Sequence, residues 1–369
     1  MNSNPRILLA PMDWGLGHTT RIIAVGRALA LRNATLILAG TAAQLKVMGE
    51  AFPLAEKVLL SGYEVTYGRR LPASWHVLRQ VPRLLRVIKQ EHQWIMHHAS
   101  ALRLDAIISD NRYGLWHPDI PSVIISHQLV PPVWRAGAGM SAWLWGAHRR
   151  FLERFDQVWI PDLPGAASLA REMIPPNLSP RYKWIGYLSR LRGMIPAAPS
   201  YLPDHLAAPD LLVLLSGPEP QRSLLQDQVL KQMPGLAATT WLVQGLPGEA
   251  RLPRQVKGGL IIPYLDAQAL SYWLPRAGVV LARSGYSSLM DFACLGLRNL
   301  VLVPTPGQPE QEYLARELAA HNRVAVADFR NLSLGQVIQE ARTASGFRKK
   351  LDDENHLGSV VGNFMTEML

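Results

Sequence analysis

The segment RILLAPMDWGLGHTTRIIAVGRALA, residues 6–30, decides the fold. Its apolar start predicts a buried strand, and the apolar residues at helical spacing near its end predict a helix. Between them, Gly15 and Gly17 permit a tight turn and the close approach of a ligand, and a helix N-terminus favours negative charge. A dinucleotide-binding fingerprint is disfavoured, because Thr20 occupies the position of its third glycine and the next strand is not followed by an acidic residue.

The same alternation of short apolar runs and helical patterns continues along the chain, as is typical of parallel α/β sheets. It predicts strands at residues 6–10, 34–39, 106–109, 122–126 and 157–160, and again at 211–215, 239–243, 259–262, 279–281 and 300–303. A proline-rich stretch separates the two sets and predicts a linker. We therefore expect two Rossmann-like parallel-sheet domains facing across a cleft, at 1–192 and 210–345, with a linker at 193–209 and a terminal helix in 346–369 that packs back on the first domain.

Composition excludes several protein classes. The 369 residues are 48% hydrophobic and 18% charged, which excludes intrinsic disorder, and 28 Gly and 28 Pro follow no repeat. The single cysteine, Cys294, lies in an apolar run, so we expect a buried thiol and a reducing, cytoplasmic compartment. The sequence shows neither a secretory signal pattern nor an apolar stretch of the length needed to span a membrane.

Basic residues are concentrated in the first half of the chain. Residues 1–192 hold 23 Lys and Arg against 12 Asp and Glu, whereas residues 193–369 hold 15 against 16. In residues 72–98, apolar residues recur at helical spacing beside Arg79, Arg83 and Arg86, which is typical of a segment at an anionic membrane surface, here the inner face of the plasma membrane. An ordinary solvated helix is the alternative. The pI of about 9.9 makes a nucleic-acid-binding protein a further alternative, but the sequence contains no recognised nucleic-acid module.

Polar residues at the ends of predicted strands are the candidates for chemistry. His18 follows the first strand, and Asp110 and His127 follow two later ones. Imidazole titrates near neutral pH, so His18 is the first candidate for a general base and Asp110 the second. Asp110 has two further possible roles, which are to orient His18 or His127 and to form an ion pair with Arg112.

The loops of the second half suit a phosphorylated, polyhydroxylated ligand. Gly285 permits close approach, the neighbouring hydroxyls and backbone N–H groups suit a phosphate, and Asp291 is placed to accept hydrogen bonds from sugar hydroxyls. Farther on, Gln311 and Glu312 supply hydrogen-bonding groups without the clustering of metal ligands.

Taken in order, these segments resemble glycosyltransferase family 28, the family of the lipid-linked N-acetylglucosaminyltransferases, which have the GT-B fold. The resemblance implies that His18 lies beside the reaction centre, and Asp110 and His127 stay catalytic candidates because of their position after predicted strands. It implies acceptor binding by Trp14, Gly15, Gly17, Asn111 and Arg112. It implies donor binding by Arg190, Ser216, Gly217, Tyr264, Leu265, Arg283, Ser284, Gly285, Tyr286, Ser287, Ser288, Asp291, Gln311 and Glu312.

Three positions depart from the family pattern. The phosphate turn at Ser216 and Gly217 continues into Pro218, Glu219 and Pro220, which remove N–H donors and add a negative charge. Glu312 replaces a carboxamide that reads the donor sugar, and a carboxylate only accepts hydrogen bonds. Bulky Trp14 changes the shape of the acceptor loop.

The expected activity is transfer of a sugar, with inversion, from a nucleoside diphosphate donor to a hydroxyl of a lipid-linked or glycan acceptor. The resemblance implies a UDP-sugar as co-substrate and no cofactor. The sequence lacks an Asp-x-Asp pair, so we expect no metal requirement. The alternative is a nucleotide-sugar 2-epimerase of the same fold, which needs no acceptor.

Overall fold

The computed structural model describes residues 4–13, 16–63, 73–130, 145–146, 148–202, 206–217, 219–246, 252–347 and 356–368, with the backbone alone described at 16 and 73–81. Trp14 and Gly15, two predicted acceptor contacts, lie outside these residues. Contacts divide the chain into a first unit of Met1–Thr66, Ser74–Leu188 and Asp352–Leu369 and a second unit formed mainly by Ser189–Leu351. Residues 189–192, which the sequence assigned to the first domain, therefore lie with the second unit.

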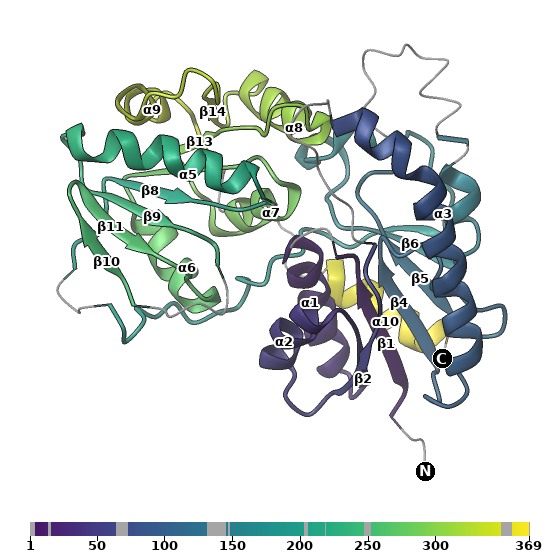
Figure 1. Ribbon diagram of the computed structural model, residues 1–369. Helices are drawn as coiled ribbons and strands as arrows, with labels where there is room; N and C mark the ends of the chain where they lie inside the picture. Colours follow the sequence, from purple (N-terminus) through teal and green to yellow (C-terminus); the bar gives the residue numbers. More distant parts are fainter. Residues whose placement is uncertain are drawn as a thin grey trace. The chain divides into compact units, whose positions relative to one another are not determined.

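The first unit is a parallel sheet covered by helices on both faces (Figure 1). In its described part the sheet has seven strands in the order β3-β2-β1-β4-β5-β6-β7, and each neighbouring pair is parallel. The strands are β1 (Arg6–Pro11), β2 (Thr35–Gly40), β3 (Glu56–Leu59), β4 (Ala106–Asp110), β5 (Ser122–Ile125), β6 (Gln157–Ile160) and β7 (Tyr182–Trp184). The helices with assigned bounds are α1 (Leu16–Ala30), α2 (Ala42–Ala51), α3 (Ala73–His98) and α10 (His356–Glu367).

Alternation of side chains along the strands explains how both faces are covered. Leu8, Ile37 and Ile107 form one core with Ile95 of α3. On the other face Leu9 approaches Gly26 of α1. The C-terminal helix α10 packs against α1 and β7.

The second unit repeats this design. Its described sheet has seven strands in the order β10-β11-β9-β8-β12-β13-β14, parallel except for the β10–β11 pair. The strands are β8 (Leu211–Leu214), β9 (Thr240–Val243), β10 (Arg254–Val256), β11 (Gly259–Ile262), β12 (Val279–Ala282), β13 (Leu300–Leu302) and β14 (Ala325–Val326). The helices are α5 (Gln221–Gln232), α6 (Ala267–Trp273), α7 (Tyr286–Leu295), α8 (Pro309–Ala320) and α9 (Leu334–Ala341). Helices α5 and α9 pack on one face, and Trp273 of α6 packs edge-to-face against Trp241 at the other.

Each predicted strand is present within two residues of its expected bounds, which confirms the α/β prediction. The sequence missed the four edge strands β3, β7, β10 and β14, because they are two to four residues long and largely exposed or half-buried. The expectation of a buried thiol is wrong, since Cys294 is partly exposed.

The strand order of each sheet indicates where a ligand would bind. In each sheet the order reverses between the first strand and the strand beside it, at β1 and β4 in the first unit and at β8 and β12 in the second. Ligands of open α/β sheets bind beyond the carboxyl ends of the strands at such reversals. Asp110 ends β4 and His18 lies in the first turn of α1, which follows β1, whereas Gly217 and Gly285 lie in the loops after β8 and β12.

Asp162, just after β6, holds together the loop that follows it. Its fully buried carboxylate accepts hydrogen bonds from the backbone N–H groups of Leu163, Leu169 and Ala170 and from the hydroxyl of Ser168. Replacing Asp162 with alanine leaves these buried donors without their acceptor, and we expect the free energy of unfolding to fall by about 2–4 kcal/mol. Urea unfolding measures this loss.

The matched control is Asp119→Ala at an exposed position, for which we expect a change within about 0.5 kcal/mol. An Asp162→Ala protein with the urea midpoint of the unmodified protein would contradict this account of the loop.

Candidate functional site

A buried carboxylate and a histidine meet at the reversal point of the first sheet. Pro11 at the end of β1 pairs with Asp110 at the end of β4, and His18 lies in the first turn of α1. The His18 Nδ1 atom is 2.8 Å from Asp110 Oδ1, and the two side chains are 13% and 0% exposed. When Nδ1–H donates to Asp110, the Nε2 atom carries the lone pair that a general base needs.

Arg21, on the next turn of α1, joins this pair and was not among the predicted site residues. Its guanidinium is 1% exposed and donates from Nε and Nη2 to the two oxygens of Asp110, at 2.9 and 2.6 Å. Its Nη1 atom lies 3.0 Å from His127 Nδ1 and its Nη2 atom 2.6 Å from His18 Nδ1. The signal in the sequence is the spacing of three residues from His18, which places both side chains on one helix face.

The surroundings of Asp110 argue against its predicted role as the base. Burial raises the pKa of this carboxyl, but Arg21 and His18 outweigh burial and hold the pKa below its ordinary value. A fully buried carboxylate that already accepts from Arg21 and His18 is suited to orienting a histidine and unsuited to reaching an acceptor hydroxyl. The alternative of an ion pair with Arg112 is wrong, because Asp110 pairs with Arg21.

Arg112 supports the loops around the site and is buried, which contradicts its predicted contact with an acceptor. Its guanidinium pairs with Glu91 at 3.2 Å and donates to the carbonyl oxygens of Pro11 and Ser61. Burial raises the pKa of Glu91 to about 7, although Arg112 lowers it. Asn111 lies beside Asp110 with a left-handed φ of 55°, a conformation that asparagine tolerates well.

The loop after β1 is also held by Gln44, a helix-capping residue of α2. Gln44 completes a capping box with Thr41 at the start of α2, and its buried Nε2 donates to the carbonyls of Pro11 and Met12, at 3.2 and 2.8 Å. The Thr-x-x-Gln spacing is visible in the sequence as a helix-start signal. Its hydrogen bonds to the loop that leads to His18 depend on the tertiary structure.

In the second unit, three predicted donor-binding residues come together. Arg190 donates from Nη1 to the hydroxyl of Tyr264, at 3.1 Å, and attracts the carboxylate of Asp291. The hydroxyl of Ser189 donates to Asp291 Oδ1, at 2.5 Å. Burial raises the pKa of Asp291 to about 6, against the opposing effects of Arg190 and Ser189. Arg190, Tyr264 and Asp291 thus gather a cation, a phenol and a carboxylate. Leu265, next to Tyr264, is buried.

The start of α7 is open to a ligand. A side chain added at Gly285 would meet no atom within 4 Å, and Ser287 and Ser288 in the first turn are partly exposed. Backbone N–H groups at a helix start bind phosphate. Tyr286 is buried, so of this residue only the backbone is suited to a ligand.

Arg283 and Ser284 differ from their predicted role because both are buried and hold loops in place. The guanidinium of Arg283 donates to the carbonyls of Val303, Pro304 and Gln221. The Ser284 hydroxyl donates to the carbonyl of Gln311, at 2.8 Å. These bonds connect the end of β12 with the end of β13, the start of α5 and the first turn of α8, which a single segment of sequence does not reveal.

The turn after β8 carries its own negative charge. Ser216 and Gly217 follow the strand, and Gly217 has a φ of 96° with open space around it. Beyond it, the carboxylate of Glu219 accepts from Arg222 and from the N–H and hydroxyl of Ser223, in the first turn of α5. Glu219 therefore occupies the helix start that a phosphate would otherwise use.

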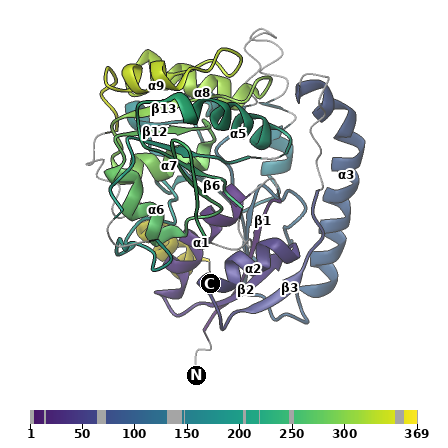
Figure 2. The same cartoon turned by 60° about the vertical axis from the view of Figure 1, so that its left-hand side comes forward.

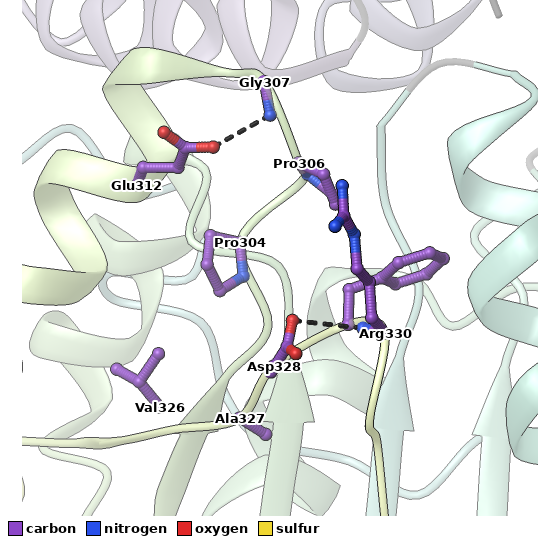
Figure 3. Close-up of a pocket in the computed structure, with 9 residues that line it drawn as sticks. Pro304, Pro306, Gly307, Glu312, Val326, Ala327, Asp328 and Arg330 are labelled. Atoms are coloured by element: carbon purple, nitrogen blue, oxygen red, sulfur yellow. Dashed lines mark hydrogen bonds between the residues drawn. The ribbon is translucent and has the colours of Figure 1, made fainter.

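Gln311 and Glu312 brace the loop after β13, as Figure 3 shows for Glu312. Gln311 Oε1 accepts from the Thr305 N–H at 2.9 Å, and Glu312 Oε1 accepts from the Gly307 N–H at 2.8 Å. A cavity of about 530 Å³ lies between this loop and residues 326–330. Among the described residues, no group of three His, Cys, Asp or Glu side chains is arranged to hold a metal ion.

No protein-family model and no curated protein sequence matches the chain. Solved structures do match along its whole length. The glycosyltransferase SnogD from Streptomyces nogalater is 13% identical, with a TM-score of 0.63 over 99% of this chain and 100% of that one. The calicheamicin glycosyltransferase CalG4 is 14% identical, with a TM-score of 0.60 over 99% and 95%. The spinosyn rhamnosyltransferase SpnG, complexed with thymidine diphosphate, is 15% identical, with a TM-score of 0.59 over 98% and 96%. This likeness shows that the chain has the GT-B fold; membership of family 28 stays a prediction.

Proposed function

We propose that this GT-B protein transfers a sugar, with inversion, from a nucleoside diphosphate donor to a hydroxyl acceptor. The observation that carries the proposal is the His18–Asp110 pair, 2.8 Å apart at the reversal point of the first sheet. The gathering of Arg190, Tyr264 and Asp291 in the second unit supports a nucleotide-sugar site there.

In the proposed reaction His18 Nε2 takes the proton of the acceptor hydroxyl, and that oxygen attacks the anomeric carbon of the donor sugar. The bond from this carbon to the diphosphate oxygen breaks on the opposite face, and the diphosphate leaves with the electron pair. Attack from the opposite face inverts the configuration. The N–H groups at the start of α7 and the charge of Arg190 stabilise the leaving diphosphate, so the protein needs no metal ion.

The same site is compatible with two kinds of donor and with one other activity. The proposed donor is a UDP-sugar, and the alternative is a thymidine diphosphate sugar, because SpnG is complexed with thymidine diphosphate. A nucleotide-sugar 2-epimerase would use the donor site without an acceptor. The structures named above are all glycosyltransferases, which favours transfer over epimerisation.

The direct test is thermal stabilisation of the purified protein by a panel of nucleoside diphosphates and their sugars. A ligand that binds only the folded state raises the Tm, by an amount equivalent to about 2.7 kcal/mol at a hundredfold excess over the Kd. We expect a rise with UDP or a UDP-sugar that is unchanged by EDTA. Loss of the rise in EDTA would contradict metal independence, and no rise with any nucleotide would contradict the donor site.

The proposed acceptor is lipid-linked or a glycan, with the first unit resting on an anionic membrane surface. Helix α3 runs along the outside of the first unit (Figure 2). It exposes Arg83, Arg86 and Lys89, and Leu85 and Met96 are 48% and 43% exposed beside them. Basic and apolar side chains together suit an interface with anionic lipid. No helix in the described part of the chain has the length and apolar character to span a bilayer.

The double substitution Arg86→Glu with Lys89→Glu tests this surface. Each basic residue near an anionic bilayer contributes about 1 kcal/mol, so reversing two charges is expected to weaken binding to phosphatidylserine vesicles at least about tenfold. Cosedimentation measures it. The control, Lys231→Glu with Arg342→Glu, makes the same charge change at exposed positions of the second unit. Equal losses in both variants would show a general charge effect and no role for α3.

A further inference from the structure

A buried carboxylate on α3 has no part in the proposed reaction. The Glu91 side chain is 3% exposed. Its Oε2 atom accepts from the Tyr63 hydroxyl at 2.6 Å and from the Gly114 N–H at 3.2 Å. Its Oε1 atom lies 3.2 Å from Arg112 Nη1. Tyr63 follows β3, whereas Arg112 and Gly114 follow β4, so one side chain of α3 joins two loops beyond the carboxyl ends of the first sheet.

The loop after β1 is joined to the same cluster by two hydrogen bonds. Arg112 Nε donates to the carbonyl oxygen of Pro11 at 3.0 Å, and the Tyr63 N–H donates to Asp13 Oδ1 at 2.9 Å. This loop leads to His18 in the first turn of α1. The carboxylate of α3 is therefore only one residue removed from the backbone that leads to the candidate base.

Helix α3 lies directly against the loop after β4. A Cβ atom at Gly114 would stand 2.2 Å from the carbonyl oxygen of Ile88 and 2.5 Å from the Cβ of Glu91. Atoms of neighbouring residues do not approach so closely, so this position requires glycine. The same approach brings the Gly114 N–H to the Glu91 carboxylate, and the hydrogen bond fixes where the helix meets the loop.

The groups around Glu91 match its ionised form. Tyr63 and Gly114 donate to one oxygen, and the other faces Arg112, which has only donors. A proton on the carboxyl group would face Arg112 or take the place of one of the two donors. Burial raises the pKa of Glu91 to about 7, and the charge of Asp13 acts in the same direction. Arg112 and the hydrogen bonds from Tyr63 and Gly114 lower the pKa and limit that rise.

We propose that ionised Glu91 is a positioning residue of the His18–Asp110 site: its carboxylate holds α3 against the loops after β3 and β4 and so fixes the loop that leads to His18. The benefit of these fixed loops for sugar transfer rests on the proposed function. The hold of Glu91 on the loops does not rest on it, because that hold is a property of the unliganded protein.

The first test follows the Gly114 amide by NMR in the full chain as the pH is varied. Protonation of Glu91 weakens the acceptor of this N–H, so we expect its chemical shift to change with a midpoint near pH 7. We expect Glu91→Gln to lose this step. In Tyr63→Phe, which removes a donor to the carboxylate, we expect the midpoint to rise by about 1 pH unit. A midpoint below pH 5 in the unmodified protein, or no step at all, would overturn the proposal.

Hydrogen exchange tests whether the carboxylate fixes the loops. The Tyr63 N–H donates to Asp13, and the Met12 N–H donates to the carbonyl oxygen of Asp110 at 2.9 Å. In Glu91→Gln we expect the exchange of these two amides to accelerate at least about tenfold more than that of the β6 amides. Equal acceleration in the loops and in β6 would show an effect on overall stability alone and would overturn the proposal.

Two further variants make the exchange experiment decisive. The matched control is Glu50→Gln at an exposed position of α2, for which we expect unchanged exchange of the loop amides. Tyr63→Phe keeps the buried charges of Glu91 and Arg112, so it provides the same comparison if Glu91→Gln does not fold. In Tyr63→Phe we expect a smaller acceleration of the Met12 amide, again relative to β6, and its absence would overturn the proposal.

Activity gives a separate readout. If the protein transfers sugar, we expect kcat of Glu91→Gln to fall about tenfold to a hundredfold with donor affinity unchanged, because small displacements of catalytic groups are costly. We expect the acid limb of kcat to move up with the Gly114 midpoint in Tyr63→Phe. A merely structural role would lower kcat equally at every pH and leave the limb in place, which would overturn the positioning role. The NMR and exchange results without any sugar transfer would support the hold of Glu91 on the loops and would reject the proposed function.

Discussion

His18→Ala is expected to lower kcat by about 10²–10⁴-fold while the affinity for the donor nucleotide stays nearly unchanged. The reason is the geometry: His18 is the partly exposed member of the pair with buried Asp110, and its removal takes away the proton acceptor. The donor contacts assigned to Arg190 and Asp291 belong to the second unit and are unaffected. Steady-state kinetics and calorimetric titration of the nucleotide measure the two quantities.

A second histidine provides the control. His97 is exposed on α3, and His97→Ala is expected to keep kcat within about twofold of the unmodified value. If His18→Ala kept full activity on substrates that the unmodified protein turns over, the assignment of the base would be wrong. A loss of donor affinity equal to the loss of kcat would instead indicate a disturbed fold.

Asp291→Asn is expected to weaken donor binding about tenfold to a hundredfold, because hydrogen bonds to a charged group contribute about 1.5–3 kcal/mol. The same change is expected to stabilise the protein at pH 7. Burial raises the pKa of Asp291 from 3.8 to about 6, so the folded state resists the charge that the unfolded state accepts freely. Stability therefore falls as pH rises from about 4 to 6, and the amide removes that cost.

The pH dependence distinguishes this account from a general packing effect. The gain from Asp291→Asn should amount to about 1–3 kcal/mol at pH 7 and should vanish below about pH 4. In the unmodified protein, donor affinity should fall as pH drops through about 6, where the carboxylate takes up a proton. Thermal melts and nucleotide titrations at pH 4, 5, 6 and 7 measure both trends.

Asp227→Asn, at an exposed position of α5, is the matched control, with no expected change in donor binding. A destabilised Asp291→Asn protein at pH 7 would contradict the electrostatic account. Full donor affinity in the Asp291→Asn protein would show that Asp291 does not bind the donor.

The sequence alone determined the α/β architecture and the location of the loops that matter. Buried parallel strands need continuous apolar runs, and loops need glycine and polar residues, so both signals are local. The short edge strands were missed because an exposed strand such as β3 has no such run. His18 and Asp291 were selected as candidates because each follows a predicted strand in a segment that resembles the family pattern, and their roles stay predictions.

Only the tertiary structure decided which polar residue does what. Arg21 and Arg112 are both arginines next to candidate residues, yet one pairs with Asp110 and the other with Glu91, 21 residues before it in the chain. Arg283 similarly gives its hydrogen bonds to distant carbonyls. A buried charge takes whichever partner the fold brings within hydrogen-bond distance, and that distance depends on strand order and helix packing, which no single segment contains.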